Sequence, residues 1–156
     1  LGLIVERRRV RSDMNRRRRL LALLFHQGVL DEQFLQVQQL EDGASPNFVS
    51  DVVAIYLRES DKLLRNLRNL LAAEEESCDY GKMGIHLNQF TGSSSTIGAH
   101  RVRDVCIAFR SASEQKNRIG CMRALEALEY EYCYLKTKFH EIFQIEQRRI
   151  AAARYP

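Results

Sequence analysis

The sequence predicts an all-α fold, and three observations support that prediction. The chain has 156 residues but only two prolines, Pro46 and Pro156, so helix breakers are rare. Long stretches repeat apolar residues every three or four positions, which is the period of an amphipathic helix. No stretch of five or more residues shows clear strand alternation. A chain of this length can bury roughly 70% of its unfolded surface, so a core needs no metal or disulfide.

The N-terminal part is expected to contain an irregular arm and two short helices. Residues 1–15 look irregular, and a helix should follow over residues 15–27 until Gly28 ends it. Asp31 is a good N-cap for a second helix that runs to about residue 40. These two helices are expected to cover one end of the rest of the chain.

Four longer helices should then form a bundle. Ser45 is expected to cap the first of them, with Pro46 in its first helical position. The glycine- and serine-rich run 92–98 should interrupt the helical pattern after the second. The last carries a coiled-coil-like seam of apolar residues at alternating spacings of four and three. The first, second and fourth helices are expected at about residues 46–73, 80–93 and 115–151. The third carries Val102, Val105, Cys106 and Phe109 on one face.

Charge is concentrated at one end of the chain. Residues 1–19 hold eight arginines and two acidic residues, a local charge of +6, whereas the remaining residues sum to −2. We therefore expect an arginine-rich arm over residues 1–15 and a single domain over 16–156, with its bundle core at about 46–150. The near-neutral body argues against nucleic acid as a partner, because a binding face would be basic along its length. The arginines act either as a solvated arm or as an import signal or weak polyanion-binding patch.

The cysteines and the hydropathy pattern indicate an intracellular protein. Cys106, Cys121 and Cys133 lie among apolar residues and are expected to be buried, and Cys78 has no neighbour at metal-site spacing. No signal peptide is expected, and no stretch reaches the ~20 apolar residues that a membrane span needs. We expect no cofactor and no membrane contact.

One segment of the second bundle helix carries the functional argument. Met83, Leu87, Phe90 and Ser94 should share its buried face. The opposite face is small, because glycines lie one turn before and one turn after Asn88. That arrangement either suits the close approach of another surface or reflects glycines near the two helix ends. The residues on this second face are Gly84, Asn88, Thr91, Gly92 and Ser95.

The stretch from Asn88 to Ala99 resembles the active-site motif of plant histidine-phosphotransfer (HPt) proteins. That motif is H-Q-[LF]-K-G-S-S-S-[ST]-I-G-A, and this chain has N-Q-F-T-G-S-S-S-T-I-G-A. The similarity extends from about Leu20 onward. Other segments that resemble the family are 28–34, 45–49, 105–110, 135–136 and 141–150. Two features make the chain resemble one subgroup of this family, the pseudo-phosphotransfer proteins that inhibit cytokinin signalling. These features are the asparagine at position 88 and the start Leu1-Gly2-Leu3.

The resemblance implies an HPt-type four-helix bundle with two additional N-terminal helices, and a monomer. It also implies that Asn88 stands at the position of the phosphorylated histidine, and Thr91 at that of a lysine. The implied protein is not an enzyme: it binds receiver domains of hybrid histidine kinases and response regulators, carries no phosphate, and competes with active HPt proteins in the cytoplasm and nucleus. Docking would use Gly84, Asn88, Gln89, Thr91, Gly92 and Ser95.

Two other functions stay open. The chain is alternatively an active phosphotransfer protein that uses another histidine, such as His86, although two residues rotate a helical side chain by roughly 200° away from Asn88. His86 is therefore expected to be structural. His26, His100 and His140 lie outside the motif and are expected to be ordinary partly buried or surface histidines. A helical scaffold with a polyanion-binding arm is the third possibility.

Overall fold

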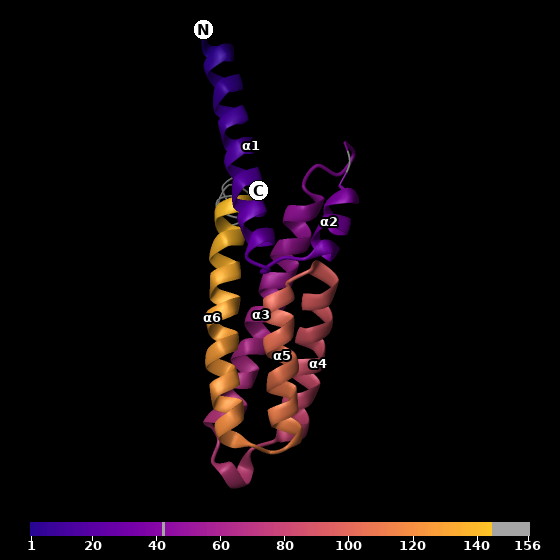
Figure 1. Cartoon of the computed structure of the whole chain (residues 1–156), viewed down its shortest axis with the longest axis vertical. Coiled ribbons are helices and arrows are strands. Elements are labelled where there is room, and N and C mark those ends of the chain that lie inside the picture. Colours follow the sequence, from indigo (N-terminus) through magenta and orange to yellow (C-terminus); the bar gives the residue numbers. More distant parts are fainter. Residues whose placement is uncertain (42, 145–156) are drawn as a thin grey trace, which may run out of the picture.

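Four long helices run side by side, and two N-terminal helices lie at one end of them (Figure 1). The computed structural model describes residues 1–41 and 43–144, and within them six α-helices and one short 3-10 turn. No β-strand occurs in these two ranges; Leu30 and Ala99 form an isolated bridge. The helices are α1 (Gly2–His26), α2 (Glu32–Gln39), α3 (Phe48–Ala72), α4 (Tyr80–Ile97), α5 (His100–Glu114) and α6 (Arg118–Phe143), and the 3-10 turn is Glu75–Ser77.

The bundle helices follow one another around a ring. Contacts join α3 to α4, α4 to α5, α5 to α6 and α6 back to α3, so that α4 and α6 lie diagonally opposite. Helix α1 packs on α6, and α2 packs on α4. The predictions of an all-α fold and of a four-helix bundle with two extra N-terminal helices are therefore confirmed for the described residues.

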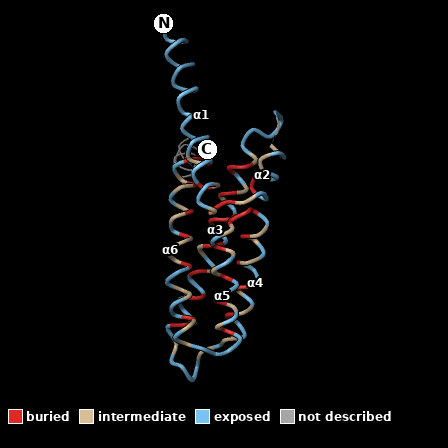
Figure 2. The backbone as a smooth tube through the Cα atoms, viewed as in Figure 1, coloured by how far each residue is buried: buried red, intermediate tan, exposed pale blue. Residues whose placement is uncertain are grey.

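A single apolar core fills the centre of the ring (Figure 2). Its largest side chains include Phe90 from α4, Phe109 from α5 and Tyr132 from α6, which are all fully buried. The aromatic ring of Phe34 on α2 stacks on Phe139 of α6 at 5.8 Å between centroids. The predicted seam of α6 is confirmed. Leu125 is half-buried, and the other six seam residues are buried: Cys121, Leu128, Tyr132, Leu135, Phe139 and Ile142.

Residues 2–15 are helical, so the prediction of irregular structure over residues 1–15 is wrong. Helix α1 begins at Gly2 and continues without a break to His26. Arginine and leucine are good helix formers, and no glycine or proline interrupts residues 3–27. The expected start at residue 15 rested on the apolar pattern alone, and exposed helix carries no such pattern. The division into an arm and a domain stays a prediction.

Two predicted helix starts are also displaced. Helix α3 begins at Phe48 rather than at Pro46. In the first turn of α3, the Val49 backbone N–H donates a hydrogen bond to the carboxylate of Glu41 at 3.4 Å. Helix α6 begins at Arg118 rather than residue 115, because the side chain of Asn117 caps it by accepting from Gly120 N–H at 3.0 Å. The described part of α6 ends at Phe143, and the predicted helical residues 145–151 lie outside the described ranges.

Cys106 and Cys121 are buried, whereas Cys133 is exposed, so the prediction for Cys133 is wrong. Its neighbours Tyr132 and Leu135 carry the inward face of α6, which turns Cys133 outward. None of the helices in the described ranges is long and apolar enough to cross a membrane.

Candidate functional site

Helix α4 carries the motif, and its two ends are fixed by different devices. At the start, the Asp79 carboxylate accepts a hydrogen bond from Lys82 N–H at 3.0 Å. At the end, Gly98 adopts a left-handed backbone conformation (φ +83°), which residues with a Cβ rarely adopt. An added Cβ there would lie 2.5 Å from the backbone nitrogen of Phe34, so α2 approaches this corner closely.

The helix runs through the glycine- and serine-rich segment, which corrects the predicted interruption at residues 92–98. Hydroxyl groups in this segment donate to carbonyl oxygens of the preceding turn. Ser93 donates to the Phe90 carbonyl at 3.2 Å, and Thr96 donates to the Gly92 carbonyl at 2.9 Å. These hydroxyl groups are paired inside the helix, which continues to Ile97 and ends where Gly98 turns into a left-handed conformation.

The buried face of α4 is the predicted one. Met83, Leu87, Phe90 and Ser94 are all fully buried. Ser94 is polar, and its hydroxyl forms a hydrogen bond of 2.8 Å with the Tyr56 hydroxyl on α3. Burial raises the pKa of Tyr56 well above the ordinary value, so the phenol stays protonated at neutral pH. The pair therefore ties the motif helix to α3 through a neutral, paired contact.

The outer face of α4 is open around Asn88. Asn88 and Gln89 are exposed, and Thr91 and Ser95 are half-buried. A Cβ added at Gly84 or Gly92 would meet no heavy atom within 4 Å, so neither glycine is required by packing inside this chain. The Thr91 hydroxyl donates to the Leu87 carbonyl at 2.7 Å and does not reach outward as a lysine would.

Arg110 on α5 completes this surface, although the sequence analysis assigned it no role. Its guanidinium Nη1 donates to the side-chain oxygen of Asn88 at 3.0 Å, and its Nε lies 3.9 Å from the Glu114 carboxylate. The signal in the sequence is faint: Arg110 follows the buried Phe109 and so lies at the edge of the α5 core face. Only the packing of α5 on α4 brings it to Asn88.

The histidines differ in their surroundings. His86 is half-buried, and its Nδ1 is buried without a hydrogen-bond partner among the described residues. His100 lies between two carboxylates, 3.4 Å from Asp31 and 3.2 Å from Asp104. No three His, Cys, Asp or Glu side chains in the described ranges converge as metal ligands.

Comparisons with known proteins agree with this architecture. Residues 51–141 match the family model described as Hpt domain. The chain is 65% identical, over 100% of its length and 99% of the relative's, to pseudo histidine-containing phosphotransfer protein 6 of Arabidopsis thaliana. It is 42% identical to histidine-containing phosphotransfer protein 1 of the same plant, over 83% of this chain and 82% of that one.

Solved structures give the same result. The maize histidine-containing phosphotransfer protein superposes with a TM-score of 0.80 at 36% identity, covering 87% of this chain and 98% of the maize chain. The Medicago truncatula protein of that description superposes with a TM-score of 0.77 at 37% identity, covering 88% and 92% of the two chains. The chain therefore belongs to the Hpt-domain family of plant histidine-containing phosphotransfer proteins.

Proposed function

We propose that this chain is a pseudo-phosphotransfer protein, which binds receiver domains through the outer face of α4 and carries no phosphate. The observation that carries the proposal is the exposed Asn88. In the active-site motif that this stretch resembles, the phosphorylated histidine stands at that position. A histidine ring nitrogen has a free lone pair that attacks an aspartyl phosphate. The asparagine amide nitrogen shares its lone pair with the carbonyl group, so it hydrogen-bonds but is no nucleophile.

The docking face consists of Gly84, Asn88, Gln89, Thr91, Gly92 and Ser95. The open space beside the two glycines supports this assignment, since a receiver can approach the helix backbone there. Arg110 supplies a cation next to Asn88. In the proposed complex this cation would face the acidic phosphate-binding pocket of the receiver. It would partly replace the lysine that active relatives have at position 91.

The proposed physiological role is inhibition by competition. Signalling contacts of this kind typically bury below about 1,200 Å² and are transient. The protein would therefore reduce cytokinin signalling in proportion to its abundance, by occupying receivers of hybrid kinases and response regulators that active HPt proteins need. Such receivers act in the cytoplasm and the nucleus, and we propose both as its locations.

A phosphorelay assay tests the absence of transfer. A phosphorylated receiver is mixed with this protein, with its Asn88→His/Thr91→Lys variant, and with an active HPt protein. We expect the parent protein to take up no acid-labile label and to slow transfer to the active protein as its concentration rises. Label on the parent protein would contradict the proposal and favour the alternative carrier, for which His86→Gln is the next variant.

A binding assay tests the docking face separately. Gly92→Glu places a bulky charge on the open surface, and we expect it to weaken receiver binding by at least about tenfold, which corresponds to ~1.4 kcal/mol. Ala127→Glu is the matched control, because Ala127 is exposed on α6, diagonally across the bundle. Equal receiver affinity of the two variants would exclude this face.

A further inference from the structure

The first part of α1 projects past the end of the bundle (Figure 1), and Val10 and Met14 line a pocket there together with Phe143 at the end of α6. We call residues 2–16 the α1 overhang. All residues from Leu1 to Arg19 are exposed, and the helix first becomes buried at Leu21 and Leu24, where it packs on α6. At 1.5 Å per residue the overhang is roughly 22 Å long. Isolated helices of this length are marginal in water, so a partner would stabilise it.

The overhang combines positive charge with large apolar side chains. Residues 1–19 carry eight arginines against two acidic residues. Leu3 is 75% exposed, and the other large apolar side chains of the overhang are more than half exposed. A helix that carries both features is typical of segments that insert into a groove of an acidic protein or lie on an anionic membrane.

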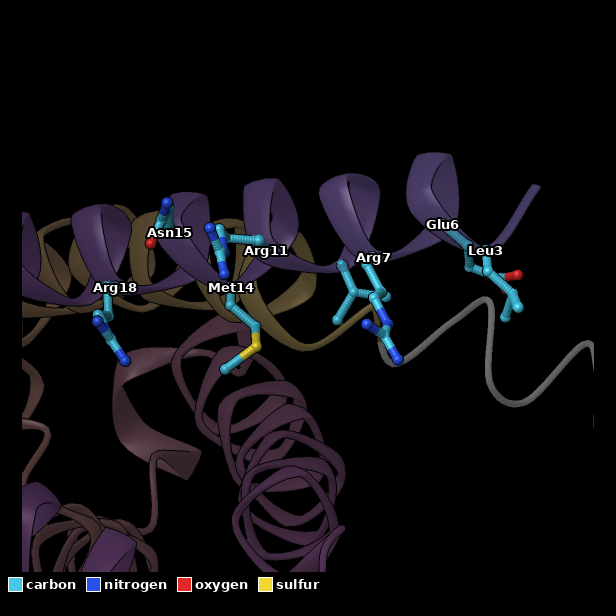
Figure 3. A pocket seen from close by; sticks show the side chains of 8 residues that line it. Leu3, Glu6, Arg7, Arg11, Met14, Asn15 and Arg18 are labelled. Carbon is cyan, nitrogen blue, oxygen red and sulfur yellow. The ribbon is translucent and has the colours of Figure 1, made fainter. Parts of the chain in front are cut away.

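The arrangement of the apolar side chains favours a groove. Leu3, Val10 and Met14 follow one another at spacings of seven and four, which places them along one side of the helix. Figure 3 shows Leu3 and Met14 pointing to the same side as Arg7 and Arg18. Other exposed apolar residues lie on different sides: Ile4 and Val5 follow Leu3 at rotations of about 100° and 200°.

A flat membrane surface contacts only one side of a helix. The arginines of α1 point to all sides of the helix, so a membrane could pair with only some of them. A protein groove that wraps the helix reaches several sectors, and acidic side chains at its rim would pair with the arginines. Charge also argues against two other occupants. A second copy would bring the same +6 segment, and residues 145–156 hold three arginines against one glutamate.

We infer that the α1 overhang is a docking helix for an acidic protein with an apolar groove. The overhang would bind by inserting Leu3, Val10 and Met14 into the groove, while its arginines meet carboxylates at the rim. This site is separate from the face around Asn88, because α1 packs on α6 and α6 lies diagonally opposite α4. The chain could therefore hold such a partner and a receiver at once.

Calorimetric titration of the full chain with calmodulin tests the inference. Calmodulin is an acidic probe whose methionine-rich groove is open with Ca²⁺ and closed without it. We expect binding in Ca²⁺ and none in EDTA. The variant Leu3→Ala/Val10→Ala/Met14→Ala keeps every charge and favours helix, and it should bind at least about tenfold more weakly. The control Ile107→Ala/Ile119→Ala removes exposed apolar residues elsewhere and should bind like the parent.

Three outcomes would overturn the inference. The first is the absence of heat exchange with Ca²⁺-calmodulin. The second is equal binding by the parent and the triple alanine variant, which would mean that charge alone acts and that any polyanion would bind. The third is binding to phosphatidylserine–phosphatidylcholine vesicles that the triple variant loses while calmodulin binds neither protein, which would assign the overhang to membranes. Circular dichroism of each variant verifies that its helices are retained.

Discussion

At the scale of single residues, the surface around Asn88 is defined by what each side chain can and cannot reach. The Asn88 side-chain oxygen is already paired with Arg110, and the Thr91 hydroxyl is turned back to the Leu87 carbonyl. The cation nearest the motif position is thus supplied by α5 and not by α4. The pair is exposed, so it contributes little to folding and stays available to a partner.

Replacing Arg110 tests whether it serves binding. Arg110→Ala should change the free energy of unfolding by no more than about 0.5 kcal/mol, because its contacts are exposed. The variant should bind a receiver about tenfold more weakly, since it loses a charged hydrogen-bond donor at the proposed interface. Arg103→Ala is a suitable control: Arg103 also lies on α5 but pairs with Asp104. Titration of both variants with one receiver measures the difference, and equal affinities would leave Arg110 without a role in docking.

Ser94 illustrates a residue with a structural role inside the motif. Ser94→Ala should lower the free energy of unfolding by about 1–3 kcal/mol, because it leaves the buried Tyr56 hydroxyl without a partner. The double variant Ser94→Ala/Tyr56→Phe should recover most of that loss, since neither hydroxyl of the pair is then left without the other. Urea denaturation of the two single variants and the double variant measures the coupling. Strict additivity of the two single effects would contradict the paired description.

At the scale of elements, the segment between the two N-terminal helices holds the C-terminal end of α4. The Asp31 N–H donates to the Gly98 carbonyl at 3.0 Å, and the His100 N–H donates to the Val29 carbonyl at 3.0 Å. The corner between α4 and α5 is therefore closed by the segment that enters α2. This arrangement explains why an added Cβ would clash at Gly98 but not at the glycines beside Asn88.

Two alanine substitutions in and after α4 separate these roles. Gly98→Ala should lower the free energy of unfolding by about 1–3 kcal/mol, because of its positive φ and the close backbone of Phe34. Gly92→Ala should raise it by about 0.5–1 kcal/mol, because the site has space and alanine favours helix. Chemical denaturation compares the two variants. Destabilisation by Gly92→Ala would mean that this glycine, too, has a structural role.

At the scale of the whole molecule, charge and packing are distributed differently. The body of the chain holds the entire described core and is nearly neutral, whereas the +6 segment lies on exposed helix. Arg17 marks the boundary: its guanidinium lies 4.5 Å from the centroid of the Phe143 ring at the end of α6. The residues that precede Arg17 in the chain form the α1 overhang.

Removal of residues 1–15 tests whether the bundle is independent of that overhang. The free energy of unfolding should change by less than about 1 kcal/mol, because every removed side chain is exposed. Receiver binding should be unchanged, and the isoelectric point should fall. Thermal unfolding and receiver titration of both lengths measure these effects. A loss of several kcal/mol would show that the overhang packs against the bundle.

The sequence by itself determined the helical class, the inward faces and the motif. Periodic apolar residues predict which side of a helix is buried, as in α4 and α6, because burial must follow the helical repeat. Helix ends were predicted less well. Residues 2–15 and the serine run are helical although no apolar period marks them, because no proline interrupts either segment.

Tertiary structure alone decided what surrounds the motif. Arg110 meets Asn88 from 22 residues away, the Tyr56 hydroxyl meets Ser94 from 38 residues away, and Gly98 lies against α2. Contacts between distant residues depend on how the helices pack around the ring, and no local pattern encodes that packing. The α1 overhang also depends on tertiary structure. Helix α1 is first buried at Leu21, where it packs on α6, and this position shows that the arginine-rich part of the helix extends past the bundle.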